Sequence, residues 1–344
     1  MILTYTATEE DCGRTVYSAM RRELKVSATL MRRLKATGAI TVAGAPVFTN
    51  YRLSPGETVA LDITNAEPPC DNIPEQGDLE ILFENEGLLA VNKQSGILVH
   101  PSRSKNTGTL ANFVAGYLAW GITGRGQEEK IYRNGSHASI CEQRRTEQQS
   151  GCQVRLCPDG VCHAVNRLDR DTSGVVLFAK NSYMKAIAST AISDETAVKE
   201  YIALVYGKTP ECGAIDVPIK RFEERNMLRI PSEDGQRAVT RYETINTTTE
   251  KDEHFSLIRL RLETGRTHQI RVHCLHIGHP VLGDKLYSTD KSRNLSEKLG
   301  ITTQALHAYK LGFNEPLSKK CIEIIAGINT KNFPCIFPKD VLAY

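Results

Sequence analysis

One stretch decides the fold prediction: His163-Ala-Val-Asn-Arg-Leu-Asp-Arg-Asp-Thr-Ser-Gly174. Within it, Asp169 lies between Arg167 and a turn of small residues. An apolar run, 175–179, follows at once and predicts a buried strand. A lone Asp near Gly usually only caps its own backbone. A carboxylate held rigidly at the edge of a core is also where a catalytic group is expected, and other motifs of the chain favour that second interpretation.

The motif around Asp169 resembles the signature Arg-Leu-Asp-x-x-Thr-Ser-Gly of the RluA-type pseudouridine synthases, which isomerise uridine within RNA. In that family the Asp is the essential catalytic residue, so the resemblance implies this role for Asp169. It also implies that Arg167 and Thr172 contact the substrate. The family usually has His where this chain has Asn166, a change that leaves the carboxylate in place.

Residues 199–207, Lys-Glu-Tyr-Ile-Ala-Leu-Val-Tyr-Gly, alternate like a strand. The alternation alone is compatible with an ordinary core tyrosine at Tyr201. The run resembles the second family motif, Lys-x-Tyr-x-Ala-x-Val-x-Gly, which implies that Tyr201 stacks on the target uracil. A base that leaves the helical stack needs a ring to replace the stacking energy that it loses.

Residues 265–273, Gly-Arg-Thr-His-Gln-Ile-Arg-Val-His, resemble the third family motif. The resemblance implies that Arg271 pairs with Asp169, that Ile270 packs beneath the base, and that Arg266 contacts the substrate. Simple solvation is the alternative for each arginine. Local pattern predicts a helix that begins near His268, with Thr267 as its N-cap.

Residues 93–101 resemble the first family motif, with Gln94 in place of its usual Pro. Gly96 and Pro101 shape a turn, and His100 has a supporting role at most. Around these motifs, hydrophobic periodicity predicts further strands and helices. The predicted strands are 79–83, 88–93, 254–263, 307–313 and 321–326, and the predicted helices are 109–120 and 182–192.

Residues 1–65 form a separate unit in which we expect one helix over 9–25 and a second that Ser27 begins and Gly38 ends. Two short strands, 39–42 and 59–63, follow. Between positions 21 and 35, six basic side chains face a single acid, Glu23. The six are Arg21, Arg22, Lys25, Arg32, Arg33 and Lys35. A solvated helix face is the alternative, but the pattern resembles a small RNA-binding module of a ribosomal protein, which implies contacts with RNA phosphates.

The fold prediction is therefore α+β. A mixed, largely antiparallel sheet with flanking helices forms a catalytic domain at 80–344, and a small α/β RNA-binding module precedes it. Residues 66–79 hold three prolines and several acids and predict a linker. Residues 121–160 are polar and aperiodic, which indicates a loop insertion.

Cysteine spacing argues against a structural metal. His137, Cys141, Cys152, Cys157 and Cys162-His163 cluster around the insertion, but their spacings are wider than those of zinc ligands. We expect no metal, and the ten cysteines of the chain are interpreted as free thiols of a reducing compartment. The N-terminus has no signal-peptide pattern and no apolar run is long enough for a bilayer, which predicts a cytoplasmic protein without membrane contact.

The 344 residues carry a net charge of +3, too small to indicate a nucleic-acid partner by itself. Isomerisation oxidises nothing and transfers no group, and the chain has no dinucleotide or phosphate-loop fingerprint, so no cofactor is expected. The predicted substrate is structured RNA, ribosomal RNA first and transfer RNA second, and a monomer is the default. A non-catalytic RNA-binding protein and an RNA N-glycosylase remain the alternatives.

Overall fold

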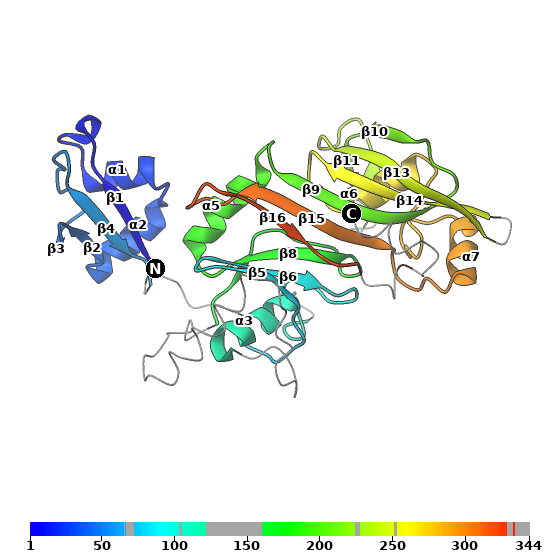
Figure 1. The fold of residues 1–344 in the computed structure, drawn as a ribbon, viewed down its shortest axis with the longest axis horizontal. Helices are drawn as coiled ribbons and strands as arrows, with labels where there is room; N and C mark the ends of the chain where they lie inside the picture. Colours follow the sequence, from blue (N-terminus) through cyan, green and yellow to red (C-terminus); the bar gives the residue numbers. More distant parts are fainter. Residues whose placement is uncertain are drawn as a thin grey trace.

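The structure is a computed structural model that describes residues 1–64, 66, 72–102, 105–121, 160–223, 228–250, 253–328 and 333. It confirms the predicted α+β class: a large, mostly antiparallel sheet with flanking helices follows a small α/β module (Figure 1). Residues 122–159 of the predicted insertion, with most of its cysteines, lie outside the described residues. No helix in the described part of the chain is long and apolar enough to cross a membrane.

The N-terminal module contains two helices and a four-stranded antiparallel sheet of order β1-β4-β2-β3. Its elements are β1 (Ile2–Thr6), α1 (Val16–Glu23), α2 (Ala28–Thr37), β2 (Ile40–Val42), β3 (Ala45–Pro46) and β4 (Thr58–Asp62). Ser27 caps α2 by accepting a hydrogen bond from the amide of Leu30, and Gly38 ends it in the left-handed conformation. Both predicted boundaries of this second helix are confirmed.

The single helix predicted over 9–25 is wrong. A 3-10 turn, η1 (Glu9–Asp11), comes first, and α1 begins only at Val16. Gly13 between them has a φ of 70°, which a continuous right-handed helix does not allow. Thr15 then starts α1 by accepting a hydrogen bond from the amide of Ser18. The spacing of hydrophobic residues gave no indication that the helix is interrupted at Gly13.

The described end of the predicted linker, 72–79, contacts the domain that follows it. The side-chain amide of Asn112 donates to the carbonyl of Ile73, and the backbone amide of Glu75 donates to the carbonyl of Asn112. Gly116 allows this approach, because a Cβ there would meet the carbonyl oxygen of Glu75 at 2.1 Å. Residues 67–71 lie outside the described residues.

The large sheet has the strand order β10-β13-β14-β9-β15-β8-β6-β5, with β16 beside β15 and β7 beside β8. Its strands are β5 (Ile81–Glu84), β6 (Leu88–Lys93), β7 (His163–Ala164), β8 (Ser173–Ala179), β9 (Val198–Tyr206), β10 (Cys212–Asp216), β13 (Val239–Glu250), β14 (Glu253–Leu262), β15 (Leu306–Asn314) and β16 (Cys321–Ile325). Among these described strands, only the pair of β15 with β8 is parallel. This pair joins two segments far apart in sequence at the point where the Asp169 motif enters the sheet.

Helices cover both faces of β8, which explains its uninterrupted apolar run. Val175 and Leu177 pack in one cluster with α5 (Ser182–Ser193), whereas Val176 and Phe178 pack in another with α3 (Leu110–Trp120). In Figure 1, α5 and α3 lie on opposite sides of this part of the sheet.

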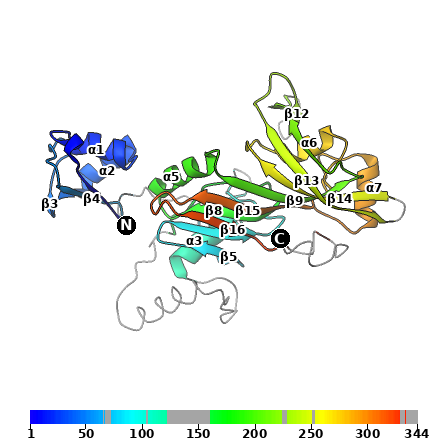
Figure 2. The ribbon, with the colours of Figure 1, turned by 45° about the horizontal axis from the view of Figure 1, so that its top comes forward.

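The other half of the sheet is covered by α6 (Gln269–His276) and α7 (Asp290–Lys298). Ala203 and Val205 of β9 pack with Ile270 of α6, while Ile202 and Leu204 pack in the cluster that contains Leu295 of α7. A separate hairpin, β11 (Ile219–Arg221) and β12 (Arg229–Pro231), stands beside α6 in both ribbon views (Figures 1 and 2).

Candidate active site

Asp169 lies on the turn that leads into β8. The turn is closed by the amide of Thr172, which donates to the carbonyl of Asp169 across 3.2 Å. The loop after β6 holds it from one side. There, the Nζ of Lys93 donates to the carbonyl of Arg170 across 2.7 Å, and the hydroxyl of Ser95 donates to the carbonyl of Asp171 across 2.8 Å. The position of Asp169 is therefore fixed through its own carbonyl and through the backbone of the two residues that follow it.

The start of strand β15 and the segment just before it hold the same turn from the other side. The side-chain amide of Gln304 donates to the hydroxyl of Thr172, and the hydroxyl of Ser173 lies 2.9 Å from Nδ1 of His307. Burial lowers the pKa of His307 to about 4, so the ring is neutral and can accept from Ser173. Gly174, with a φ of 112°, is needed next, because a Cβ there would meet the carbonyl oxygen of Ala308 at 2.2 Å.

Arg271 of α6 pairs with Asp169, as the third motif implied. Its Nη1 donates to Oδ2 of Asp169 across 2.7 Å. Its Nε and Nη2 donate to the buried carboxylate of Asp284 across 2.6 and 2.9 Å, and its guanidinium lies 4.8 Å from the ring centre of Tyr287. Burial opposes the charge of Arg271, but Asp284 and Asp169 together raise its pKa above the ordinary value. One guanidinium thus joins the Asp169 turn to a rigid anchor.

His268 is a second neighbour of the carboxylate, with Nε2 3.8 Å from Oδ2 of Asp169. Its Nδ1 lies 2.8 Å from the hydroxyl of Tyr287, which already accepts from the backbone amide of Arg229. A tyrosine hydroxyl can accept two hydrogen bonds or donate one, so this contact is compatible with either tautomer of the His268 ring. Burial lowers the pKa of His268, with Arg271 acting in the same direction and the charge of Asp169 opposing it.

His268 also corrects the predicted start of α6. Thr267 is not the N-cap: that position belongs to His268, which has a left-handed φ of 58° and makes no side-chain cap. The side chain of Gln269 instead holds the turn before the helix, because its Oε1 accepts from the backbone amide of Arg266 and from the hydroxyl of Thr264. The strained residue therefore lies directly beside Asp169.

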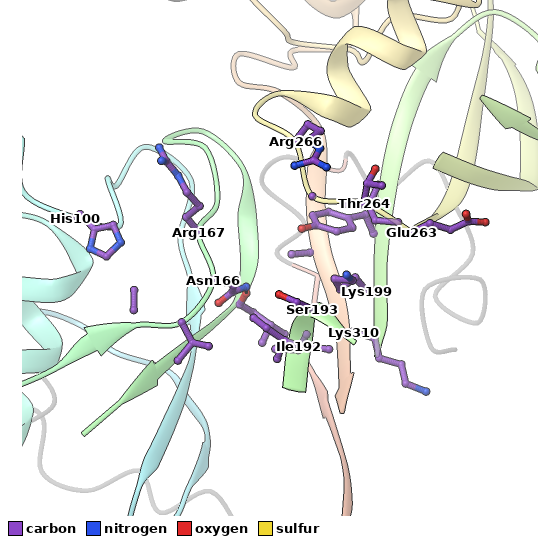
Figure 3. A pocket seen from close by; sticks show the side chains of 18 residues that line it. His100, Asn166, Arg167, Ile192, Ser193, Lys199, Glu263, Thr264, Arg266 and Lys310 are labelled. Carbon is purple, nitrogen blue, oxygen red and sulfur yellow. The ribbon is translucent and has the colours of Figure 1, made fainter. Parts of the chain in front are cut away.

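A pocket of about 540 Å³ opens between the two halves of the sheet. Figure 3 shows His100 and Arg167 on one side of it and Arg266 on the other. Tyr201 also lines it, is partly buried, and has a pKa raised by burial and by the charge of Asp169. Three residues predicted from the motifs, Arg167, Tyr201 and Arg266, thus meet at one pocket near Asp169.

The structure does not place every predicted residue at the pocket lining. Ile270 is buried in the cluster against which Tyr201 packs, so it lies behind the tyrosine. Thr172 is buried and hydrogen-bonded to Gln304, a location that suits holding the turn rather than touching a ligand. The catalytic and substrate-binding roles of all these residues stay predictions.

Three parts of the site were not predicted from the sequence. Asp284 was not named as a site residue, and His268 and Lys93 were given no role although they lie in the third and first motifs. An available signal was a charged residue in an apolar context, since Lys93 ends the buried strand β6 and is itself completely buried. Only the folded chain shows that Asp284 is the second partner of Arg271.

The six basic residues of the N-terminal module are not equivalent. Arg22 pairs with Glu10 and Glu23 at 3.4 and 3.0 Å, and Arg33 donates to the carbonyl of Ala66. Arg21 donates to the carbonyl of Val26. Lys25, Arg32 and Lys35 are exposed and make no such contact within the described part of the module. These three have the most freedom to contact a polyanion.

No group of three or more metal-binding side chains occurs among the described residues. Of the cysteine and histidine group near the insertion, only Cys162 and His163 fall in that part of the chain, and the others lie outside it. In the same described part, Cys12, Cys212, Cys274 and Cys321 are free thiols, in line with the sequence prediction.

The model of the family described as RNA pseudouridylate synthase matches residues 87–276, which contain the Asp169 signature and the first, second and third motifs. The chain belongs to this family of isomerases. An uncharacterised RNA pseudouridine synthase of Bacillus subtilis, YhcT, is 33% identical over 91% of this chain and 89% of its own length. Ribosomal large subunit pseudouridine synthase D of Zymomonas mobilis is 31% identical over 93% and 92%.

Solved structures agree in fold. The structure of human RNA pseudouridylate synthase domain containing 1 superposes with a TM-score of 0.51 at 20% identity, and covers 78% of this chain and 90% of that one. Family membership therefore rests on sequence, and the structural likeness extends it to the arrangement of the sheet.

Proposed function

We propose that this synthase isomerises uridine to pseudouridine in structured RNA, with Asp169 as the catalytic residue and without a cofactor. The main support for this proposal is the orientation of the Asp169 carboxylate. Both neighbours, Arg271 and His268, approach Oδ2, whereas Oδ1 accepts no hydrogen bond within the described part of the chain. One oxygen is held, and the other is available to a substrate.

The reaction breaks the N1–C1′ bond, turns the uracil, and forms a C5–C1′ bond. The proton on C5 leaves, and N1 gains one, so no oxidant and no transferred group is needed. An aimed carboxylate can attack C1′, add to C6 of the uracil, or take the proton from C2′. Each route uses the single available oxygen of Asp169, and the three routes stay open.

A flipped uridine needs a surface for its base and contacts for its backbone. We infer that Tyr201 stacks on the uracil, with Ile270 packed behind the ring, and that Arg167 and Arg266 contact the neighbouring phosphate or ribose groups. Both arginines are exposed at the rim of the pocket on opposite sides.

Ribosomal RNA is the leading substrate and transfer RNA the second. The first is supported by the name of the Zymomonas relative, which is a ribosomal large subunit enzyme, and by the exposed basic residues of the N-terminal module. Large folded RNA is held mainly through its shape and backbone, which suits such a module. A cytoplasmic location and a monomeric state belong to the same proposal.

The deciding experiment uses RNA that carries tritium at C5 of uridine. Wild-type protein should release tritium and leave the RNA chain intact. Asp169→Asn should release none while it still binds the RNA. Free uracil in place of pseudouridine would mean hydrolysis by an RNA N-glycosylase, and binding without tritium release by the wild type would mean a non-catalytic protein.

A further inference from the structure

A second pocket of about 390 Å³ lies next to the catalytic pocket, between the β11–β12 hairpin and the loop before α6. Four basic side chains and one acid line it, with uncharged residues between them. The lining basic residues are Lys220, Arg221, Arg229 and Arg266. The acid, Asp234, is exposed and pairs with Lys220 at 3.0 Å, and basic side chains outnumber it among the described lining residues.

The floor of this groove is rigid. Ile219 and Gln236 exchange two backbone hydrogen bonds of 2.9 Å, and Gly235 lies so close to Ile219 that a Cβ on it would meet backbone atoms at 2.6 Å. On the far wall, Nε of Arg266 donates to the carbonyl of Arg237 across 3.0 Å. The basic side chains therefore project from fixed backbone rather than from a loose surface loop.

Two connections tie the groove to the active site. Arg266 lines both pockets, so a ligand bound in the groove would lie next to the catalytic pocket. Arg229 donates from its backbone amide to the hydroxyl of Tyr287, and that hydroxyl meets His268, the neighbour of Asp169. A ligand in the groove would thus lie at the start of a short series of contacts. Two hydrogen bonds join Arg229 to Tyr287 and Tyr287 to His268, and Nε2 of His268 then lies 3.8 Å from Oδ2 of Asp169.

We propose that this groove binds the RNA phosphodiester backbone directly beside the target uridine, and this proposal rests on the function proposed above. Lysine and arginine side chains on fixed backbone suit phosphate oxygens, which take most protein contacts to nucleic acid. The lining residues include no aromatic ring, so the groove suits phosphate and ribose rather than a stacked base. The groove positions the strand, and the neighbouring pocket receives the extruded base.

The first test removes two positive charges from the groove with the double variant Lys220→Gln/Arg221→Gln. The matched control is Lys208→Gln/Lys291→Gln, which removes two exposed charges elsewhere on the catalytic domain. The probe is an unmodified transcript of large-subunit ribosomal RNA, with Kd measured over a range of salt. We expect about tenfold weaker binding for the groove variant. The slope of log K against log salt concentration, where K is the association constant, should also be less steep. We expect this slope to decrease in magnitude by about one for each phosphate that the protein no longer neutralises.

Binding by the groove variant that equals the control, at unchanged salt dependence, would overturn the proposal. Thermal unfolding of both variants and of Lys220→Arg/Arg221→Lys checks that the fold survives. The charge-conserving variant should keep near-wild-type binding. If the charge-conserving variant remains folded but loses as much RNA affinity as the glutamine variant, the groove does not bind the RNA through its phosphate charge, and the proposal is also wrong.

The second test locates the RNA phosphate that the groove contacts. Short substrate RNAs carry a single uncharged methylphosphonate linkage at successive positions around the target uridine. One linkage next to that uridine should weaken wild-type binding about tenfold and leave the Lys220→Gln/Arg221→Gln variant unaffected. Equal losses in both proteins at every linkage would overturn the placement.

The failure of the proposed function would look different. If the wild type releases no tritium from any uridine-labelled RNA, isomerisation is excluded. The salt-dependent binding of the transcript then still decides whether the groove holds an RNA backbone.

Discussion

The ammonium group of Lys93 donates a hydrogen bond of 2.7 Å to the carbonyl of Arg170, the residue that follows Asp169. It donates two more, to the carbonyls of Gln94 and Ile97, at 3.0 and 2.8 Å. A completely buried lysine with three backbone acceptors joins the loop after β6 to the turn that carries Asp169. We propose that Lys93 positions Asp169, since it is not among the residues that line the pocket.

Lys93→Met should therefore lower kcat more than it changes RNA binding. Methionine fills the space but leaves three carbonyls without a donor, and the turn that carries Asp169 can then shift. A misplacement of about 1 Å can cost roughly 100-fold in rate. Tritium release and Kd, measured on the same preparation, separate the two effects. A variant that loses RNA affinity at full kcat would contradict the positioning role.

The same lysine predicts a pH dependence of stability. Burial lowers the pKa of Lys93 from 10.5 to about 7, against the opposing charges of Asp171 and Asp169. Between these two values the unfolded chain holds the extra proton, so this group's contribution to the free energy of unfolding rises with pH. The rise is at most about 1.4 kcal/mol per pH unit, and the contribution is flat below the folded pKa.

Urea unfolding of the wild type and Lys93→Met at about pH 6 and about pH 9 measures this effect. The difference in free energy of unfolding should move in favour of the wild type at the higher pH. A difference that stays constant would show that the lysine keeps its proton in the folded protein through this whole range.

Arg271→Lys should destabilise the protein and abolish most activity. Lysine keeps the charge but cannot serve Asp284 and Asp169 together, so one buried or half-buried carboxylate loses its partner. Breaking a buried pair costs roughly 3–5 kcal/mol. Arg241→Lys is the control, because Arg241 is exposed and pairs with Glu263 at the surface, where the loss should be within about 1 kcal/mol. Equal losses in the two variants would rule out the bridging role.

Tyr201 predicts a contrast between two substitutions. Its hydroxyl makes no hydrogen bond within the described part of the chain, so Tyr201→Phe should keep the stacking surface and most of the activity. Tyr201→Leu removes the ring, and base stacking on a ring is worth on the order of 1–3 kcal/mol. Tritium-release kinetics should then fall at least several-fold. If Phe is as poor as Leu, the hydroxyl rather than the ring acts in the reaction.

The N-terminal module allows a matched comparison of charges. Arg32→Gln/Lys35→Gln removes two exposed cations, whereas Arg22→Gln/Arg33→Gln removes two that are already held by Glu10, Glu23 or the carbonyl of Ala66. We expect Arg32→Gln/Lys35→Gln to weaken RNA binding more than the other variant. The slope of log association constant against log salt concentration should decrease in magnitude by about one for each phosphate that is no longer neutralised. Filter binding over a salt series measures both. A larger effect of the second pair would place the RNA on another face.

Local pattern predicted most elements but not all. The cap at Ser27, the end at Gly38 and the strand after Asp169 depend on neighbours within a few residues, and they are present in the structure. The twelve-residue strand β13, rich in threonine and charge, was not predicted. It became a strand because it pairs with β10 and β14 on both sides, which a pattern of apolar alternation does not record.

The order of amino acids was enough to single out Asp169, Tyr201 and Arg271, because each lies in a motif that resembles one of the family. It also implied, through resemblance alone, that Arg271 meets Asp169 across 102 positions of the chain. Folding in three dimensions was needed to show that Asp284 anchors that arginine, that His268 shares Oδ2, and that Lys93 and His307 hold the turn from opposite sides. Such partners come from distant strands, and their contacts depend on how the sheet closes rather than on any local spacing.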